Sequence, residues 1–135
     1  MSFSATRRHA ALLLASAALV GGTTTGAAAG TNAQAATTFP CDVNMSAAGI
    51  LTAGYYSGNT VNPSTSSVTA AGKEAQCLLQ YQDYNPGTVD GIFGSKSQAA
   101  ARSFQSNINR VCKTDLDVDG MIGKESWPHL RRLFC

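Results

Sequence analysis

The chain has few of the residues on which catalytic and metal sites depend. Of its two histidines, His9 lies near the N-terminus and only His129 lies in the rest of the chain. Nucleophilic Ser-His-Asp and Cys-His sites need a histidine. Zinc sites use closely spaced Cys and His pairs, and the four cysteines form no CxxC pair. We therefore expect a protein that is not an enzyme and that holds no cofactor or metal.

The chain also lacks an excess of positive charge. Its ten Lys and Arg include Arg7 and Arg8, which lie in a segment expected to be removed, so eight remain against eight Asp and Glu. A nucleic-acid-binding domain carries a basic stripe, which this balance excludes. We expect the pair Arg131 and Arg132 to complement a helix end.

No apolar run is long enough to span a membrane as a helix. The run Ala10–Val20 is shorter than the roughly 20 residues required. It follows a basic pair and precedes the small-residue site Ala33-Gln34-Ala35, which predicts a secretory signal peptide over residues 1–35. A twin-arginine signal is the alternative. We expect a secreted monomer with no membrane contact after cleavage.

All four cysteines follow the predicted cleavage site. An even number of cysteines in a small exported domain indicates two disulfides. The spacing permits three connectivities. We predict Cys77–Cys112, which ties the first helix to the loop after the second, and Cys41–Cys135, which joins the ends of the mature chain.

The mature chain changes character near residue 72. Residues 36–71 are poor in large apolar residues and rich in Thr, Ser, Asn and Gly. This composition predicts an extended arm that packs on the domain and is held by Cys41. Disorder of residues 57–69 is the alternative. Residues 72–135 carry helical periodicity and form the expected domain.

A short phrase occurs twice in this domain. Val89-Asp90-Gly91-Ile92-Phe93-Gly94 returns as Val118-Asp119-Gly120-Met121-Ile122-Gly123, 29 residues later, and Ser97 returns as Ser126. Glycine permits positive φ, and aspartate bonds its own loop backbone. The repetition predicts that one loop-to-helix joint is built twice.

Three apolar stripes accompany these loops. They predict helices around Ala75–Leu79, around Ala100–Ile108, and from Trp127 to Phe134. The predicted fold class is all-α: a small three-helix bundle with two repeated Asp-Gly loop-helix units, preceded by an extended arm and stabilised by disulfides. The expected core consists of Leu79, Phe93, Phe104, Trp127 and Leu130.

Residues 72–133 resemble the peptidoglycan-binding domain, a non-catalytic three-helix module of bacterial cell-wall hydrolases. The matching pieces are Ala75-Gln76, Tyr84-Asn85-Pro86-Gly87, the two Asp-Gly phrases, Phe104-Gln105 and Ser126-Trp127. The structural positions of this pattern are Asp90, Gly91, Phe93, Gly94, Phe104, Asp119, Gly120, Gly123 and Trp127. Gln82-Asp83 departs from the usual Leu-Gly, serine replaces threonine at Ser97 and Ser126, and the loop 109–117 is longer than usual.

The resemblance implies a secreted module that binds peptidoglycan through its glycan or its stem peptide. We predict that the ligand lies between the second and third helices and contacts Tyr84, Arg102 and Gln105, with Arg102 pairing a stem-peptide carboxylate. The alternative is a secreted interaction or inhibitor protein that keeps the fold without cell-wall affinity. The longer loop 109–117 favours this alternative.

Two further chemistries match parts of the sequence. Asp115, Asp117 and Asp119 imitate the start of a calcium loop, but its twelfth position is Ser126 and Glu125 lies one residue early. We expect Asp90 and Asp119 to cap turns instead. Carboxylates such as Glu74 are expected to be surface groups rather than a glycosidase pair.

Overall fold

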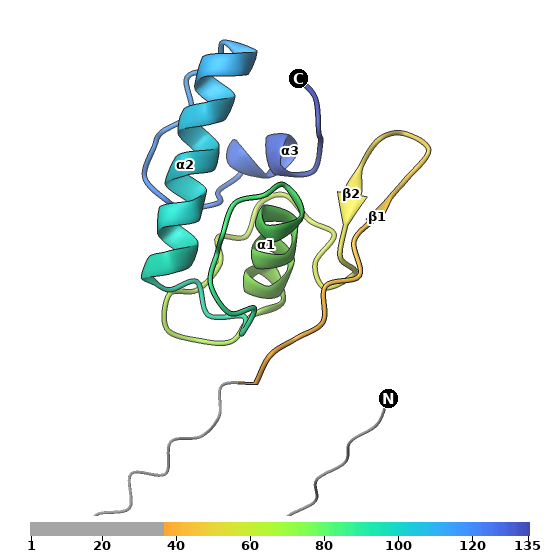
Figure 1. Ribbon diagram of the computed structural model, residues 1–135, viewed down its shortest axis with the longest axis vertical. Helices are drawn as coiled ribbons and strands as arrows, with labels where there is room; N and C mark the ends of the chain where they lie inside the picture. The colour runs from red at the N-terminus through yellow and green to blue at the C-terminus, as the bar shows by residue number, and fades with distance from the viewer. Residues whose placement is uncertain (1–36) are drawn as a thin grey trace, which may run out of the picture. The chain divides into compact units, whose positions relative to one another are not determined.

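The computed structural model describes residues 37–135. The predicted signal peptide, residues 1–35, lies outside this range. Within it, the chain forms a short hairpin followed by three helices (Figure 1). These elements are β1 (Asn44–Met45), β2 (Leu51–Thr52), α1 (Ala70–Tyr81), α2 (Ser95–Cys112) and α3 (Ser126–Leu130). No helix of the described range is long and apolar enough to cross a membrane.

The predicted helical class is confirmed, with differences at the helix ends. α1 begins at Ala70, where the Thr69 hydroxyl accepts a hydrogen bond from the N–H of Gly72 as an N-cap. α3 has five residues and is shorter than predicted. The expected extension of its stripe to Phe134 is wrong, because the Phe134 side chain is 86% exposed.

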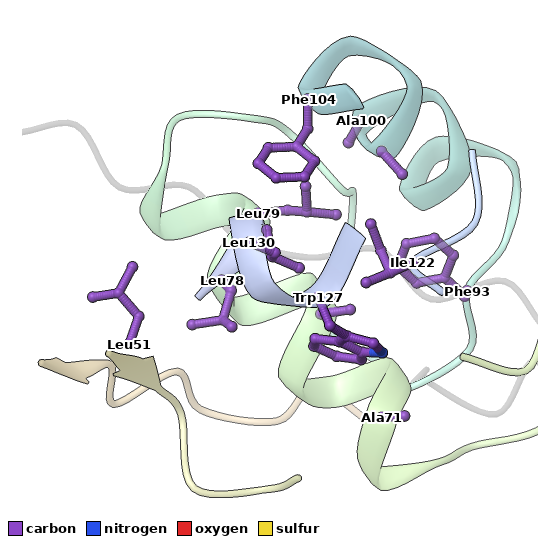
Figure 2. Packing of buried hydrophobic residues seen from close by; sticks show 12 residues of the cluster. Leu51, Ala71, Leu78, Leu79, Phe93, Ala100, Phe104, Ile122, Trp127 and Leu130 are labelled. Atoms are coloured by element: carbon purple, nitrogen blue, oxygen red, sulfur yellow. The ribbon is translucent and has the colours of Figure 1, made fainter. Parts of the chain in front are cut away.

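The predicted core is confirmed. Leu79, Phe93, Phe104, Trp127 and Leu130 have no exposed surface. Figure 2 shows side chains from the three helices meeting Phe93 and Ile122, which come from the two Asp-Gly loops. These two residues hold the same place in the repeated phrase, 29 residues apart. Each loop therefore contributes one large apolar side chain to the core.

The N-terminal arm, residues 37–69, packs on the helices. It contains one antiparallel hairpin, in which Asn44 pairs with Thr52, and is otherwise irregular with several bends. Leu51 of the hairpin is fully buried in the core (Figure 2). The indole N–H of Trp127 donates to the carbonyl of Val61 at 2.9 Å. Strands of two residues are too short to show an alternating pattern, so the sequence did not predict the hairpin.

Two disulfides form, but the predicted pairing is wrong. Cys41 is bonded to Cys77, and Cys112 is bonded to Cys135. The expected Cys77–Cys112 bond fails because α2 is long and Cys112 is its last residue, beside the C-terminal tail (Figure 1). Cys77 is buried on α1 and meets the arm instead. Each bond therefore joins a terminal segment to a helix.

A buried ion pair also holds the arm. Arg131 Nη1 lies 3.0 Å from Glu74 Oε1, and the two side chains are 5% and 0% exposed. The Glu74 carboxylate accepts hydrogen bonds from the N–H groups of Ala53, Tyr55 and Tyr56. The Arg131 guanidinium donates to Asn59 Oδ1 and to the carbonyls of Leu51, Tyr56 and Gly58. The expectation that Glu74 is a surface group is wrong, because the arm covers it. Arg131 lies at the C-cap of α3, the expected helix end, but its guanidinium bonds Glu74 and the arm.

We expect the removal of either disulfide to lower the stability of the protein. The bonded cysteines are 36 and 23 residues apart in sequence, and the chain-entropy model assigns about 4 and about 3 kcal/mol to loops of these lengths. Replacing Cys112 and Cys135 together by serine should lower the free energy of unfolding by about 3 kcal/mol, measured by urea denaturation. Non-reducing peptide mapping that recovers Cys41 joined to Cys135 would contradict this connectivity.

Because of the ion pair, we expect substitution of Arg131 to lower stability far more than substitution of the neighbouring Arg132. Arg131→Met leaves Glu74 buried without its partner and should lower the free energy of unfolding by about 3–5 kcal/mol. Arg132→Met removes the same charge from an exposed position and should change it by about 0.5 kcal/mol or less. Urea denaturation of both variants measures the difference. Equal effects would show that the pair does not fasten the arm.

Candidate functional site

The first Asp-Gly loop is held by a glutamine of α1. Gln76 Nε2 lies 3.1 Å from Asp90 Oδ1, 3.0 Å from the carbonyl oxygen of Ile92 and 3.0 Å from Ser97 Oγ. Its Oε1 accepts a hydrogen bond of 2.8 Å from the N–H of Gly91. The Gln76 side chain is thus the centre of the loop, and the residue is 1% exposed.

The second loop is held in the same way by a glutamine of α2. Gln105 Nε2 lies 3.0 Å from Asp119 Oδ1, 2.9 Å from the carbonyl oxygen of Met121 and 3.2 Å from Ser126 Oγ. Its Oε1 accepts from the N–H of Gly120 at 2.9 Å. Gln105 follows Gln76 by 29 residues, so helix glutamine, loop and serine recur as one unit. We call each set of bonds a glutamine cage.

The aspartates shape their own turns inside these cages. Asp90 Oδ1 accepts from the N–H of Ile92 at 2.9 Å, and Asp119 Oδ1 accepts from the N–H of Met121 at 2.8 Å. Gly120 has a φ of +79°, and a Cβ there would lie 2.8 Å from the carbonyl oxygen of Gln98. Only glycine fits this turn against α2.

The structure places two of the three residues predicted to contact a ligand, Arg102 and Gln105, against Gly120 of the second loop, and Tyr84 elsewhere. Gln105 is 1% exposed, with its amide committed to the cage. Tyr84 is half-buried, its ring packs edge-on against Phe104, and its hydroxyl accepts a hydrogen bond from Asn107 Nδ2. Arg102 is exposed on α2, and its guanidinium lies against Gly120 of the second loop.

The part that Gln76 plays was not predicted from the sequence. The available signal was the 29-residue spacing, because Gln76 and Gln105 obey it together with Asp90 and Asp119. A polar residue that repeats in step with a turn, on the buried face of a helix, predicts a structural bond rather than a ligand contact.

A surface hollow lies beside each cage. The first hollow, of about 270 Å³, is lined by Thr88, Asp90, Ser95, Lys96 and neighbouring residues of the first loop. The second hollow, of about 410 Å³, is lined by the corresponding Asp117, Asp119, Lys124, Glu125 and their neighbours. Thr60 and Asn62 of the arm line the second hollow in addition. The two hollows thus share a scaffold and differ in their walls.

The second hollow is polar and carries charges of both signs. Lys124 lines it together with Asp117, Asp119 and Glu125, and none of its lining residues is aromatic. Asp119 is already engaged through Oδ1 with Gln105 and Met121. Within residues 37–135, no three His, Cys, Asp or Glu side chains cluster as metal ligands would. The arrangement offers hydrogen bonds and ion pairs to a polar ligand.

Comparison with known families finds a similarity in this part of the chain. Residues 68–130 match the model of the putative peptidoglycan-binding domain. The resemblance expected from the sequence is therefore confirmed. The match contains the three helices, both glutamine cages and the lining of both hollows apart from the arm. It leaves out the arm residues Thr60 and Asn62, and also Arg131.

A solved structure supports the same peptidoglycan-binding resemblance. The chain is similar to a peptidoglycan-binding protein from Clostridioides difficile, determined in complex with glutamine hydroxamate, with 28% identity and a TM-score of 0.52. The similarity covers 67% of this chain and 56% of that one, so the chain spans just over half of that protein's length. No match is found among the curated proteins.

The cage predicts that Gln105 is a structural residue. Gln105→Leu leaves the buried N–H of Gly120 without its acceptor and should lower the free energy of unfolding by about 2–3 kcal/mol. Gln80→Leu, at an exposed position of α1, is the matched control and should change it by about 0.5 kcal/mol or less. Urea denaturation measures both. A Gln105→Leu protein of unchanged stability would contradict the structural role.

Proposed function

We propose that the protein is a secreted, non-catalytic module that binds bacterial peptidoglycan. The observation that carries this proposal is the match of residues 68–130 to the peptidoglycan-binding domain. The similar protein from Clostridioides difficile is also named for peptidoglycan binding. Two disulfides in a domain of this size fit an oxidising compartment outside the cytoplasm.

We further propose that the second hollow is the binding site, with Arg102 at its edge. The hollow opens between the loop that follows α2 and the start of α3, and it is the larger of the two. Arg102 is exposed and lies against Gly120, the turn that borders the hollow. A guanidinium in this position can bind a carboxylate of a stem peptide with two parallel hydrogen bonds.

Of the three contact residues expected from the sequence, Arg102 is the one that remains in this proposal. Gln105 is among the residues that line the hollow, but its side-chain amide is engaged in holding the loop. Tyr84 borders a separate hollow with Asp83 and Asn85. The lining of the second hollow includes carboxylates but neither histidine nor cysteine, so it offers no Ser-His or Cys-His nucleophile.

A secreted interaction or inhibitor protein is the second candidate. The observation that favours it is a set of exposed apolar side chains next to the Cys112–Cys135 bond. Val111 is 53% exposed and Phe134 is 86% exposed, and each adjoins one of the bonded cysteines. Such side chains suit contact with another protein.

The test of the proposed function is a pull-down with purified sacculi. The wild-type protein should sediment with the sacculi, and Arg102→Ala should bind more weakly by about tenfold or more, because it loses a charged hydrogen bond worth about 1.5–3 kcal/mol. Its melting temperature should stay unchanged. Arg110→Ala is the control, since Arg110 is exposed on the same helix and its guanidinium bonds only Asn107 among the described residues.

The outcomes separate the two candidates. If Arg102→Ala binds as well as the wild type while folded, the ligand lies elsewhere on the domain. If the wild-type protein itself fails to sediment with sacculi, peptidoglycan binding is refuted and the interaction-protein candidate takes its place.

A further inference from the structure

We infer that the arm completes the second hollow as a groove for the peptide part of peptidoglycan, with Thr60 and Asn62 as the residues that determine this specificity. The inference rests on the proposed function, because it names the part of peptidoglycan that the module binds. The first hollow, which has the same scaffold but no wall from the arm, is inferred not to bind this ligand.

The two hollows provide an internal comparison. Both lie beside a glutamine cage, and their loop residues correspond at a spacing of 29. The second hollow differs because Thr60 and Asn62 add a further wall. It is also larger, at about 410 against 270 Å³. The arm therefore distinguishes two surfaces that the repeat alone would make alike.

This wall is fixed in place by the core. Between Thr60 and Asn62, the carbonyl of Val61 accepts the indole N–H of the buried Trp127 at 2.9 Å. The N–H groups of Thr60 and Val61 donate to the hydroxyl of Tyr56 at 3.1 and 3.0 Å. A wall held in this way loses little conformational entropy when a ligand binds.

Asn62 presents an amide that suits a peptide. It is exposed at the hollow, and its side chain bonds no other described residue. An asparagine amide offers one acceptor and two donors, which match the N–H and C=O of a peptide group. Asn62 Oδ1 lies so near Gly123 that a Cβ on that glycine would be 3.1 Å away.

The charges favour a peptide over a sugar chain. Lys124 lines the hollow together with three acidic residues, Asp117, Asp119 and Glu125, which gives the lining a formal excess of negative charge. A stem peptide with a free amino group and a carboxylate can pair with both signs. Glycan hydroxyl and acetamido groups carry no charge, and the hollow has no aromatic side chain for a sugar ring to pack against. The peptide is therefore the occupant that fits.

The experiment is competition for sacculus binding, with two soluble probes. Free stem peptides should displace the protein from sacculi, and peptide-free glycan strands should not. Acetylation of the amino group of the stem peptide should weaken its competition several-fold. Displacement by the glycan strands and not by the peptides would overturn the inference and leave the proposed function standing. Failure of the wild-type protein to bind sacculi would overturn both.

Variants in the wall sharpen the test. Asn62→Ala should weaken stem-peptide binding about 3- to 10-fold, the equivalent of one hydrogen bond, with an unchanged melting temperature. Lys96→Ala in the first hollow should bind like the wild type. An Asn62→Ala protein that binds with wild-type affinity would overturn the assignment of this residue.

Equivalent glycines in the two loops allow a second test with a matched pair of variants. Gly123→Ala forces the Asn62 amide to move and should weaken stem-peptide binding, whereas Gly94→Ala, at the same place in the first loop, meets nothing within 4 Å and should not. Neither glycine has a positive φ, so alanine fits both backbones. Equal stem-peptide affinity of the two variants would overturn the inference.

Discussion

The fold depends on a buried glutamine amide, which occurs once in each copy of the repeat. A glutamine side chain carries both an acceptor and donors, and each cage uses both: Oε1 accepts from a loop glycine, and Nε2 donates to an aspartate and a backbone carbonyl. A glutamate could not make this set of bonds, because its carboxylate would face the aspartate without a proton to donate. While the amide holds the loop, Phe93 or Ile122 is directed into the core.

The arm and the tail supply the additional stabilising constraints that so small a core needs. Domains of this size bury a modest share of their surface and need additional constraints. Cys41 ties the arm to α1, and Cys135 ties the tail to α2. The Glu74–Arg131 pair adds a further attachment and satisfies backbone groups of the arm. The matched domain is thus enclosed by segments that lie outside the family pattern.

The sequence predicted what is local and periodic. The helices follow from apolar stripes, and the core residues follow from the same stripes together with the repeated phrase. The disulfide pairing depended on how far α2 continues and on which segment meets Cys77, which no spacing reveals. Glu74 and Arg131 are 57 residues apart, and each resembles a surface charge in the sequence. Gln105 resembles a ligand contact when it is considered alone, whereas its recurrence as Gln76 in the first copy of the repeat indicates a structural role.

The two copies of the repeat separate folding from recognition. The residues that they share are those that hold the loop: the glutamine, the aspartate, the glycines and the serine. The residues that differ face the hollows, where Thr88 and Lys96 of the first copy correspond to Asp117 and Glu125 of the second. Bonds inside the cage constrain the first group, while the second group is free to vary without loss of the fold. A hollow built on such a scaffold can bind a different ligand when its lining residues change. The wall that the arm adds to the second hollow is the largest difference between the two hollows.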